Sequence, residues 1–145
     1  MSRRISGGAA LATALCAATL LTGCEEPAER VARHHQRGVE RLAGNDPDGA
    51  RLEFRNALHI DENHAPSRYE IARLYEQEGE FRAAVGNYRL VAELDPTHVQ
   101  TRVRLAELLM IAGAPEEAAP FADAAFALAP GDPAVLAVRA ALAQA

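Results

Sequence analysis

The chain has 145 residues, a length that allows one domain, and its 15 basic residues, all of them arginine, are outnumbered by 20 acidic ones. The formal net charge of −5 argues against nucleic acid as a partner, because a polyanion is bound by a basic surface. Alanine is abundant and tryptophan is absent, a composition that favours closely packed helices.

Residues 1–23 have the composition of a targeting segment and not of a folded domain. Arg3 and Arg4 precede an uncharged run from Ile5 to Leu21, and Cys24 stands where the apolar sequence stops. This pattern resembles a bacterial lipoprotein signal peptide with its lipobox, Leu-Thr-Gly-Cys. The resemblance implies cleavage before Cys24 and attachment of acyl chains such as palmitate to Cys24. Two other interpretations remain open from the residues alone, a single membrane-spanning helix and a plain secretory signal.

Cleavage before Cys24 would change both the charge and the cysteine content of the chain. Loss of Arg3 and Arg4 leaves 13 basic residues against 20 acidic ones, a formal net charge of −7. Cys16 would be removed and Cys24 would be blocked, so the mature chain would have no disulfide and no free thiol. We expect residues 24–30 to be a short polar tether. We expect the protein to be lipid-anchored on the periplasmic side of the bacterial cell envelope, in the inner or the outer membrane.

From Val31 onward, the sequence repeats with a period of 34 residues. The best-formed copy, 65–98, has apolar residues at helical spacing in two segments, a turn at Gly79 between them and Pro96 at its end. Small residues recur where two helices must approach closely, since a larger side chain would hold the backbones apart. The recurring positions are Gly38, Ala72 and Ala106 in the first helices, Ala50, Ala84 and Ala118 in the second helices, Gly79 and Gly113 in the turns, and Pro96 and Pro130 at the ends.

This pattern resembles the tetratricopeptide repeat (TPR) family. The resemblance implies an all-α fold, a right-handed α-solenoid of three helix hairpins over 31–64, 65–98 and 99–132. A C-terminal helix over 133–145 would either cap the stack or belong to a truncated repeat.

Two sequence signals predict where helices begin. Asp46 and Asp132 are each followed by proline, and Asp at the N-cap with Pro at the first helical position is a typical helix start. The helix after Asp132 is apolar nearly all round, with only Arg139 and Gln144 as polar residues. We therefore expect its outer face to be an interaction surface, such as one for self-association, or the trace of a truncation.

Motifs of catalysis are missing from the sequence. It contains no His-Glu-x-x-His, no glycine-rich phosphate loop and no nucleophile elbow, so we expect no enzyme and no cofactor. The histidines do not stand at metal-ligand spacing, and we expect no metal site. They are His34, His35, His59, His64 and His98.

The remaining candidate site is the concave groove that the family resemblance implies, lined by the first helix of each hairpin. A mixture of aromatic, arginine, amide and apolar side chains suits an extended peptide or an amphipathic helix of a partner protein. The family's carboxylate clamp requires lysine, which this chain lacks, so we do not expect that binding mode. The residues expected to line the groove are His35, Val39, Tyr69, Arg73, Glu76, Gln100, Val103, Glu107 and Met110.

Two functions from different classes follow. The first is a membrane-anchored interaction module that scaffolds an envelope, exopolysaccharide, pilus or secretion complex. The segments Asn56–Leu58 and Gly86–Tyr88, with the alanine-rich end of the chain, resemble TPR lipoproteins of exosortase-linked (PEP-CTERM) exopolysaccharide systems. The alternative is a small saccharide-binding or catalytic protein on a TPR scaffold, for which Tyr69 would be the one aromatic platform in the groove.

Overall fold

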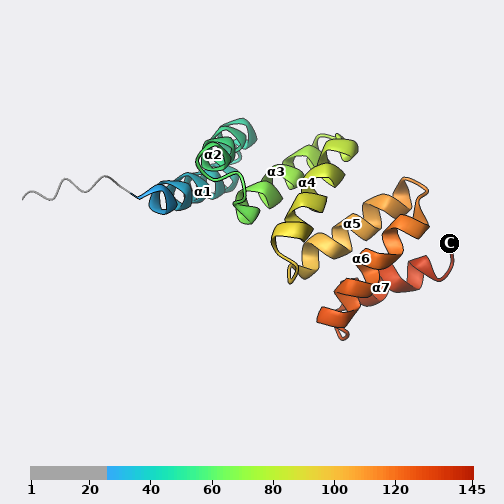
Figure 1. Ribbon diagram of the computed structural model, residues 1–145. Coiled ribbons are helices and arrows are strands. Elements are labelled where there is room, and N and C mark those ends of the chain that lie inside the picture. Colours follow the sequence, from blue (N-terminus) through green and yellow to red (C-terminus); the bar gives the residue numbers. More distant parts are fainter. Residues whose placement is uncertain (1–25) are drawn as a thin grey trace, which may run out of the picture.

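The computed structural model describes residues 26–145, and the expected signal segment with Cys24 lies outside them. The described residues form helices joined by short turns, with no strand among them. Consecutive helices pair as hairpins, α1 with α2, α3 with α4 and α5 with α6, and these follow one another in a stack that ends with α7 (Figure 1). The bounds are α1 Pro27–Ala43, α2 Pro47–Ile60, α3 Ala65–Gln77, α4 Phe81–Leu94, α5 Val99–Ile111, α6 Pro115–Leu128 and α7 Pro133–Leu142.

The helix starts follow the local sequence signals. The side chain of Asp46 accepts a hydrogen bond from the Gly49 amide at 2.9 Å, and that of Asp132 accepts one from the Ala134 amide at 2.8 Å, as predicted for N-caps. The start of α1 differs from the expectation. This helix begins at Pro27, so residues 27–30 belong to it and not to a tether, because proline at the first position and Glu29 in the first turn favour a helix there.

The turn inside each hairpin contains one residue in the left-handed region. Gly79 has φ +79° and Gly113 has φ +74°, where glycine carries no steric penalty. The first hairpin has Asn45 at the same repeat position, with φ +58°. Asparagine is the residue next best suited to that conformation, so the turn geometry is kept without a glycine.

The recurring small residues lie where the helices of a hairpin meet, as predicted. Ala72 and Ala84 are fully buried in the second hairpin, and the matching alanines of the third hairpin are fully buried as well. Phe54 and Tyr88 are also fully buried and fill the space that the small residues leave. Each helix therefore buries its apolar stripe against the neighbouring helices of the stack.

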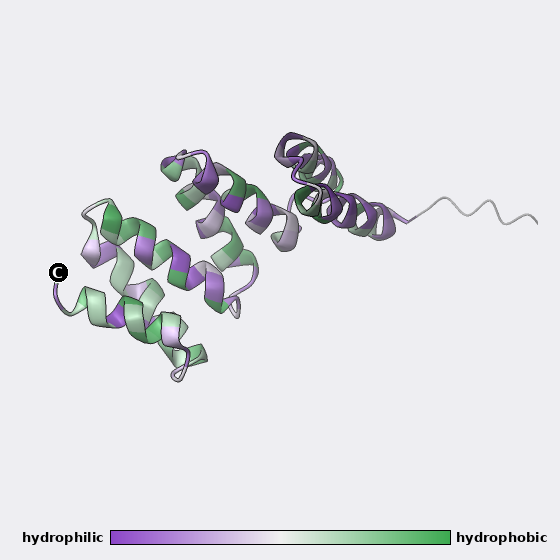
Figure 2. Ribbon diagram, turned by 180° about the vertical axis from the view of Figure 1, so that it is seen from behind, coloured by the Kyte–Doolittle hydropathy of each residue, from purple (hydrophilic) through white to green (hydrophobic). Residues whose placement is uncertain are grey.

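Hydropathy changes along the stack. Figure 2 shows that α1 and α2 are mostly hydrophilic, whereas α6 and α7 are mostly apolar. No helix of residues 26–145 is long and apolar enough to cross a membrane. On α7, Val135 and Val138 are buried against α5 and α6, while Leu136 is 48% exposed. One face of α7 is thus packed against the stack. Binding of another protein or of a second copy by its outer face stays a prediction.

Candidate functional site

A continuous groove runs along the first helices of the hairpins. It consists of four hollows, each named here by one residue that lines it: the Val39 hollow of about 510 Å³, and the His98, Gln100 and Glu76 hollows of about 250, 260 and 250 Å³. Tyr69 lines the last three, and Arg73 lines both the Glu76 hollow and the Val39 hollow. Because neighbouring hollows share residues, they form one surface that an extended segment could follow.

Nearly all of the residues expected in the groove line these hollows. His35 and Val39 come from α1, and Gln100 and Glu107 come from α5. Val103 reaches the Gln100 hollow but is only 6% exposed, since it packs in the core with Ala125 and Val135. Met110 lines none of the four hollows and packs against the cluster of Ala106 and Leu109. The remaining residues, Tyr69, Arg73 and Glu76, all come from α3.

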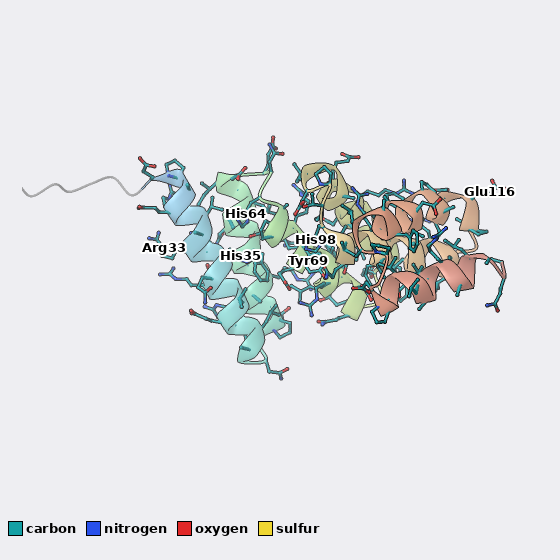
Figure 3. All side chains as sticks on the ribbon, turned by 90° about the horizontal axis from the view of Figure 1, so that it is seen from below. Arg33, His35, His64, Tyr69, His98 and Glu116 are labelled. Carbon is teal, nitrogen blue, oxygen red and sulfur yellow. The ribbon has the colours of Figure 1, made fainter. Side chains whose placement is uncertain are left out.

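Tyr69 lies at the centre of the groove. Its ring centroid is 4.7 Å from that of His98 and 5.7 Å from that of Tyr88, so two neighbouring rings fix its position. Figure 3 shows Tyr69 and His98 next to each other, with His64, the N-cap of α3, and His35 of α1 farther toward the first hairpin. Burial raises the pKa of the Tyr69 phenol, which therefore stays neutral at physiological pH.

The floor of the groove carries a charged network that joins the second and third hairpins. The Nε of Arg104 donates to Oε2 of Glu76 at 3.1 Å, and the Arg104 guanidinium also pairs with Glu107. The buried hydroxyl of Tyr88 donates to the same Glu76 oxygen at 3.1 Å. Glu76 thus satisfies a polar group that would otherwise be buried without a partner, and it links α3 to α4 and α5.

Sequence reasoning missed four charged residues that line the hollows. Arg104 and Glu70 project from α5 and α3, and Asp95 and Asp132 lie in the loops before α5 and α7. Glu70 and Arg104 are 34 residues apart and therefore occupy the same position of successive repeats. Adding that one position to the expected groove positions would have identified both. The two aspartates belong to loops, which the positions mapped from the family pattern do not include.

The histidines of the second and third hairpins cap helices. Nδ1 of His64 accepts a hydrogen bond from the Ser67 amide at 3.3 Å, and Nδ1 of His98 accepts one from the Thr101 amide at 3.2 Å. Because Nδ1 of His64 accepts this bond, it carries no proton, and the Ser67 hydroxyl donates to it as well, at 2.8 Å. Nδ1 of His35 then donates to Oγ of Ser67 at 3.1 Å. Within residues 26–145, no three side chains of the metal-binding types converge on one point.

This chain of hydrogen bonds predicts that acid weakens the fold. Burial lowers the pKa of both His35 and His64 below the ordinary 6.5, against the opposing charges of Glu70 and Asp61. The unfolded chain therefore binds more protons than the folded chain below about pH 6.5. The contribution of these two histidines to the free energy of unfolding is fully present above that pH, and it is lost as the pH drops toward their folded-state pKa values. We expect a lower melting temperature at about pH 5.5 than at about pH 7.5, measured by circular dichroism.

Substitution of His64 isolates this effect. His64→Asn keeps a side-chain acceptor at the N-cap but cannot titrate, so it should reduce the loss of melting temperature between the two pH values. His59→Asn is the matched control, because His59 is exposed near the end of α2. Equal pH dependence in the His64 variant and the parent would contradict the role given to this cap.

The fold and the groove define the class of the protein as an α-helical repeat scaffold. Residues 77–142 match the tetratricopeptide repeat family. The fold is similar to the TPR domain of Arabidopsis OM64, with a TM-score of 0.72 and 16% identity over 82% of this chain and 98% of that one. It is also similar to the type III secretion translocator chaperone SycD of Yersinia enterocolitica, with a TM-score of 0.69 and 16% identity over 81% and 83% of the two chains.

A third similar structure is the first TPR domain of Spaghetti (RPAP3), with a TM-score of 0.72 and 15% identity over 80% of this chain and 92% of that one. No curated protein matches the sequence significantly. The described residues thus have an all-α, TPR-like fold of paired helix hairpins, and residues 77–142 of them match the family itself.

Proposed function

We propose that this domain is a protein–protein interaction module that binds an extended or helical segment of a partner in the groove along α1, α3 and α5. The observation that carries the proposal is the continuity of the hollows around Tyr69, since a linear segment needs an uninterrupted track with pockets for successive side chains. Each hollow around Tyr69 is smaller than a typical small-molecule site and suits a single side chain.

Structures with the same fold support this proposal. The first TPR domain of Spaghetti is bound to an HSP90 peptide, and SycD was solved with a peptide of the translocator YopD. The HSP90 peptide, SRMEEVD, is acidic at its end. Because the present chain has no lysine and its groove arginines are already paired with carboxylates, we propose a partner of different chemistry.

Photo-crosslinking in cells tests the groove. A photoreactive residue in place of Gln100, an exposed position that lines a hollow, should capture the partner. The same residue in place of Arg82 on α4, which is exposed but lines none of the four hollows, is the control. We expect a crosslinked species from position 100 only, and its loss in the Tyr69→Ala variant, which removes the ring that lines three of the hollows.

The control variant decides the interpretation. Equal capture from both positions, or capture that survives Tyr69→Ala, would mean that the partner binds elsewhere. Circular dichroism of each variant separates loss of binding from loss of folding, since Tyr69 also packs on Tyr88.

We further propose that the domain is held at the periplasmic face of the envelope by lipid on Cys24, where it scaffolds an exopolysaccharide, pilus or secretion complex. The lipobox-like sequence supports this, and α1 begins at Pro27, so little chain would separate the domain from the lipid. Mass spectrometry of the protein from detergent-solubilised membranes should find Cys24 acylated at the new N-terminus. An unmodified Cys24 in a freely soluble protein would overturn the anchoring without affecting the groove.

A further inference from the structure

The charges of the groove are unbalanced, and the imbalance points to the chemistry of the bound segment. Two arginines line the hollows, and both are paired inside the groove, Arg73 with Glu70 at 2.9 Å and Arg104 with Glu76 and Glu107. Within the part of the chain that the structure describes, no cationic side chain of the groove is left for a further carboxylate. Any additional acid in the hollows therefore makes their lining negative, and Arg102, whose charge acts on Asp95 from outside the hollows, donates to the Pro96 carbonyl and not to that carboxylate.

Two additional acids are present, and each has one oxygen available. Oδ1 of Asp95 accepts from the amide of Thr97 at 3.0 Å and from its hydroxyl at 2.7 Å. Oδ1 of Asp132 accepts from the amides of Ala134 and Val135 at 2.8 and 3.3 Å. In residues 26–145, neither Oδ2 has a hydrogen bond or an ion pair. Local bonds therefore fix each carboxylate in place and leave its second oxygen for a ligand.

The two aspartates line different hollows that share one aromatic ring. Asp95 lines the His98 hollow, Asp132 lines the Gln100 hollow, and Tyr69 lines both. An aromatic ring and a carboxylate in one small hollow attract a cation together, because the ring quadrupole and the charge both favour it. Asp95 also remains ionised, since hydrogen bonds from Thr97 lower the pKa of its carboxyl group.

We propose that the segment bound in the groove is basic, and that it places arginine or lysine side chains in the two hollows that Tyr69 shares with Asp95 and Asp132. This inference rests on the proposed function, because it names the chemistry of the groove's partner. It separates this groove from one that would accept acidic peptides such as the HSP90 segment bound to Spaghetti. The net charge of −5 of the whole chain has the same sign and would steer a basic partner toward the domain.

The test uses short fluorescein-labelled peptides that share one Gly-Ser-Leu framework and carry arginine, glutamine or glutamate at the same positions. We expect the arginine peptide to bind about tenfold more tightly than the glutamine peptide, and the glutamate peptide to bind least. Raising NaCl from about 50 to about 500 mM should remove most of the difference. Fluorescence anisotropy with the purified domain measures all three.

Asparagine substitutions identify the acids responsible. The double variant Asp95→Asn and Asp132→Asn should lose about tenfold in affinity for the arginine peptide, because asparagine keeps the Oδ1 acceptor and the cap of α7 but removes the charge. The matched control is Asp48→Asn with Glu116→Gln, two exposed acids in the first turns of α2 and α6 that line none of the hollows. This control pair should leave the affinity unchanged.

Three results would overturn the proposal: equal affinity for the arginine and glutamine peptides, tighter binding of the glutamate peptide, or no loss in the double asparagine variant. Absence of binding by all three peptides would overturn it as well, since the hollows would then lack intrinsic affinity for cations. None of these results would contradict a partner crosslinked at position 100, so failure of this inference and failure of the proposed function are distinguishable.

Discussion

Replacing Tyr88 with alanine is expected to lower the free energy of unfolding by about 3–5 kcal/mol, the usual cost of removing a large buried aromatic side chain. The ring of Tyr88 is fully buried between the second and third hairpins, in a cluster with Ala72, Ala84 and Leu105. Its loss would leave a cavity that the surrounding alanines are too short to fill. Urea unfolding followed by circular dichroism would measure the change, which should appear as a lower midpoint.

Tyr88→Phe separates the ring from the hydroxyl. It keeps the packing and removes the hydrogen bond to Glu76, which retains Arg104 as a partner. We therefore expect a loss of about 1 kcal/mol, the net value of one hydrogen bond. If alanine were as mild as phenylalanine at this position, the ring would not be holding the hairpins together.

Gly38→Ala is expected to destabilise the domain by about 1–3 kcal/mol through overpacking. A Cβ atom on Gly38 would lie 2.4 Å from Cε1 of Phe54, far inside van der Waals contact. Phe54 is fully buried, so its ring cannot move away without disturbing the first hairpin. The second and third hairpins have alanine at this position, and only the first has glycine. Thermal and urea unfolding of the variant would measure the loss.

Gly86→Ala is the matched control, because it makes the same chemical change inside another helix. A Cβ atom at Gly86 meets no atom within 4 Å, and the residue lies in the interior of α4. Alanine should stabilise this helix by about 0.5–1 kcal/mol, since glycine loses more backbone entropy. The two substitutions should therefore have opposite signs. Stabilisation by both would show that the Phe54 ring adapts at little cost.

Most of the fold could be predicted from the sequence because small side chains recur at the same positions of each 34-residue repeat. Small residues at Ala72, Ala84 and their equivalents can lie only at close helix contacts, and the structure confirms it. The start of α1 was missed because residues 25–30 are mainly polar and have no apolar stripe. Pro27 was the available signal, since proline favours the first position of a helix.

The candidate site was less predictable, because it depends on how neighbouring hairpins are placed relative to each other. The residues of the first helices followed from the family pattern, but the pairing of Arg104 with Glu76 joins positions 28 apart on different hairpins. No local pattern encodes such a pair. The capping roles of His64 and His98 were missed for another reason, since histidine is not among the usual N-cap residues.

The stacking of hairpins has a mechanical consequence for the groove. Each hairpin packs mainly on its immediate neighbours, so no distant contact fixes the curvature of the whole stack. Small rotations at the α2–α3 and α4–α5 junctions would add up along the stack and change the width of the groove. The Arg104–Glu76 bridge stiffens the second of these junctions, and the Arg51–Glu78 ion pair and the hydrogen bond from His35 to Ser67 stiffen the first. Adaptation to partners of different thickness would therefore be shared between the two junctions, because a polar bridge crosses each of them.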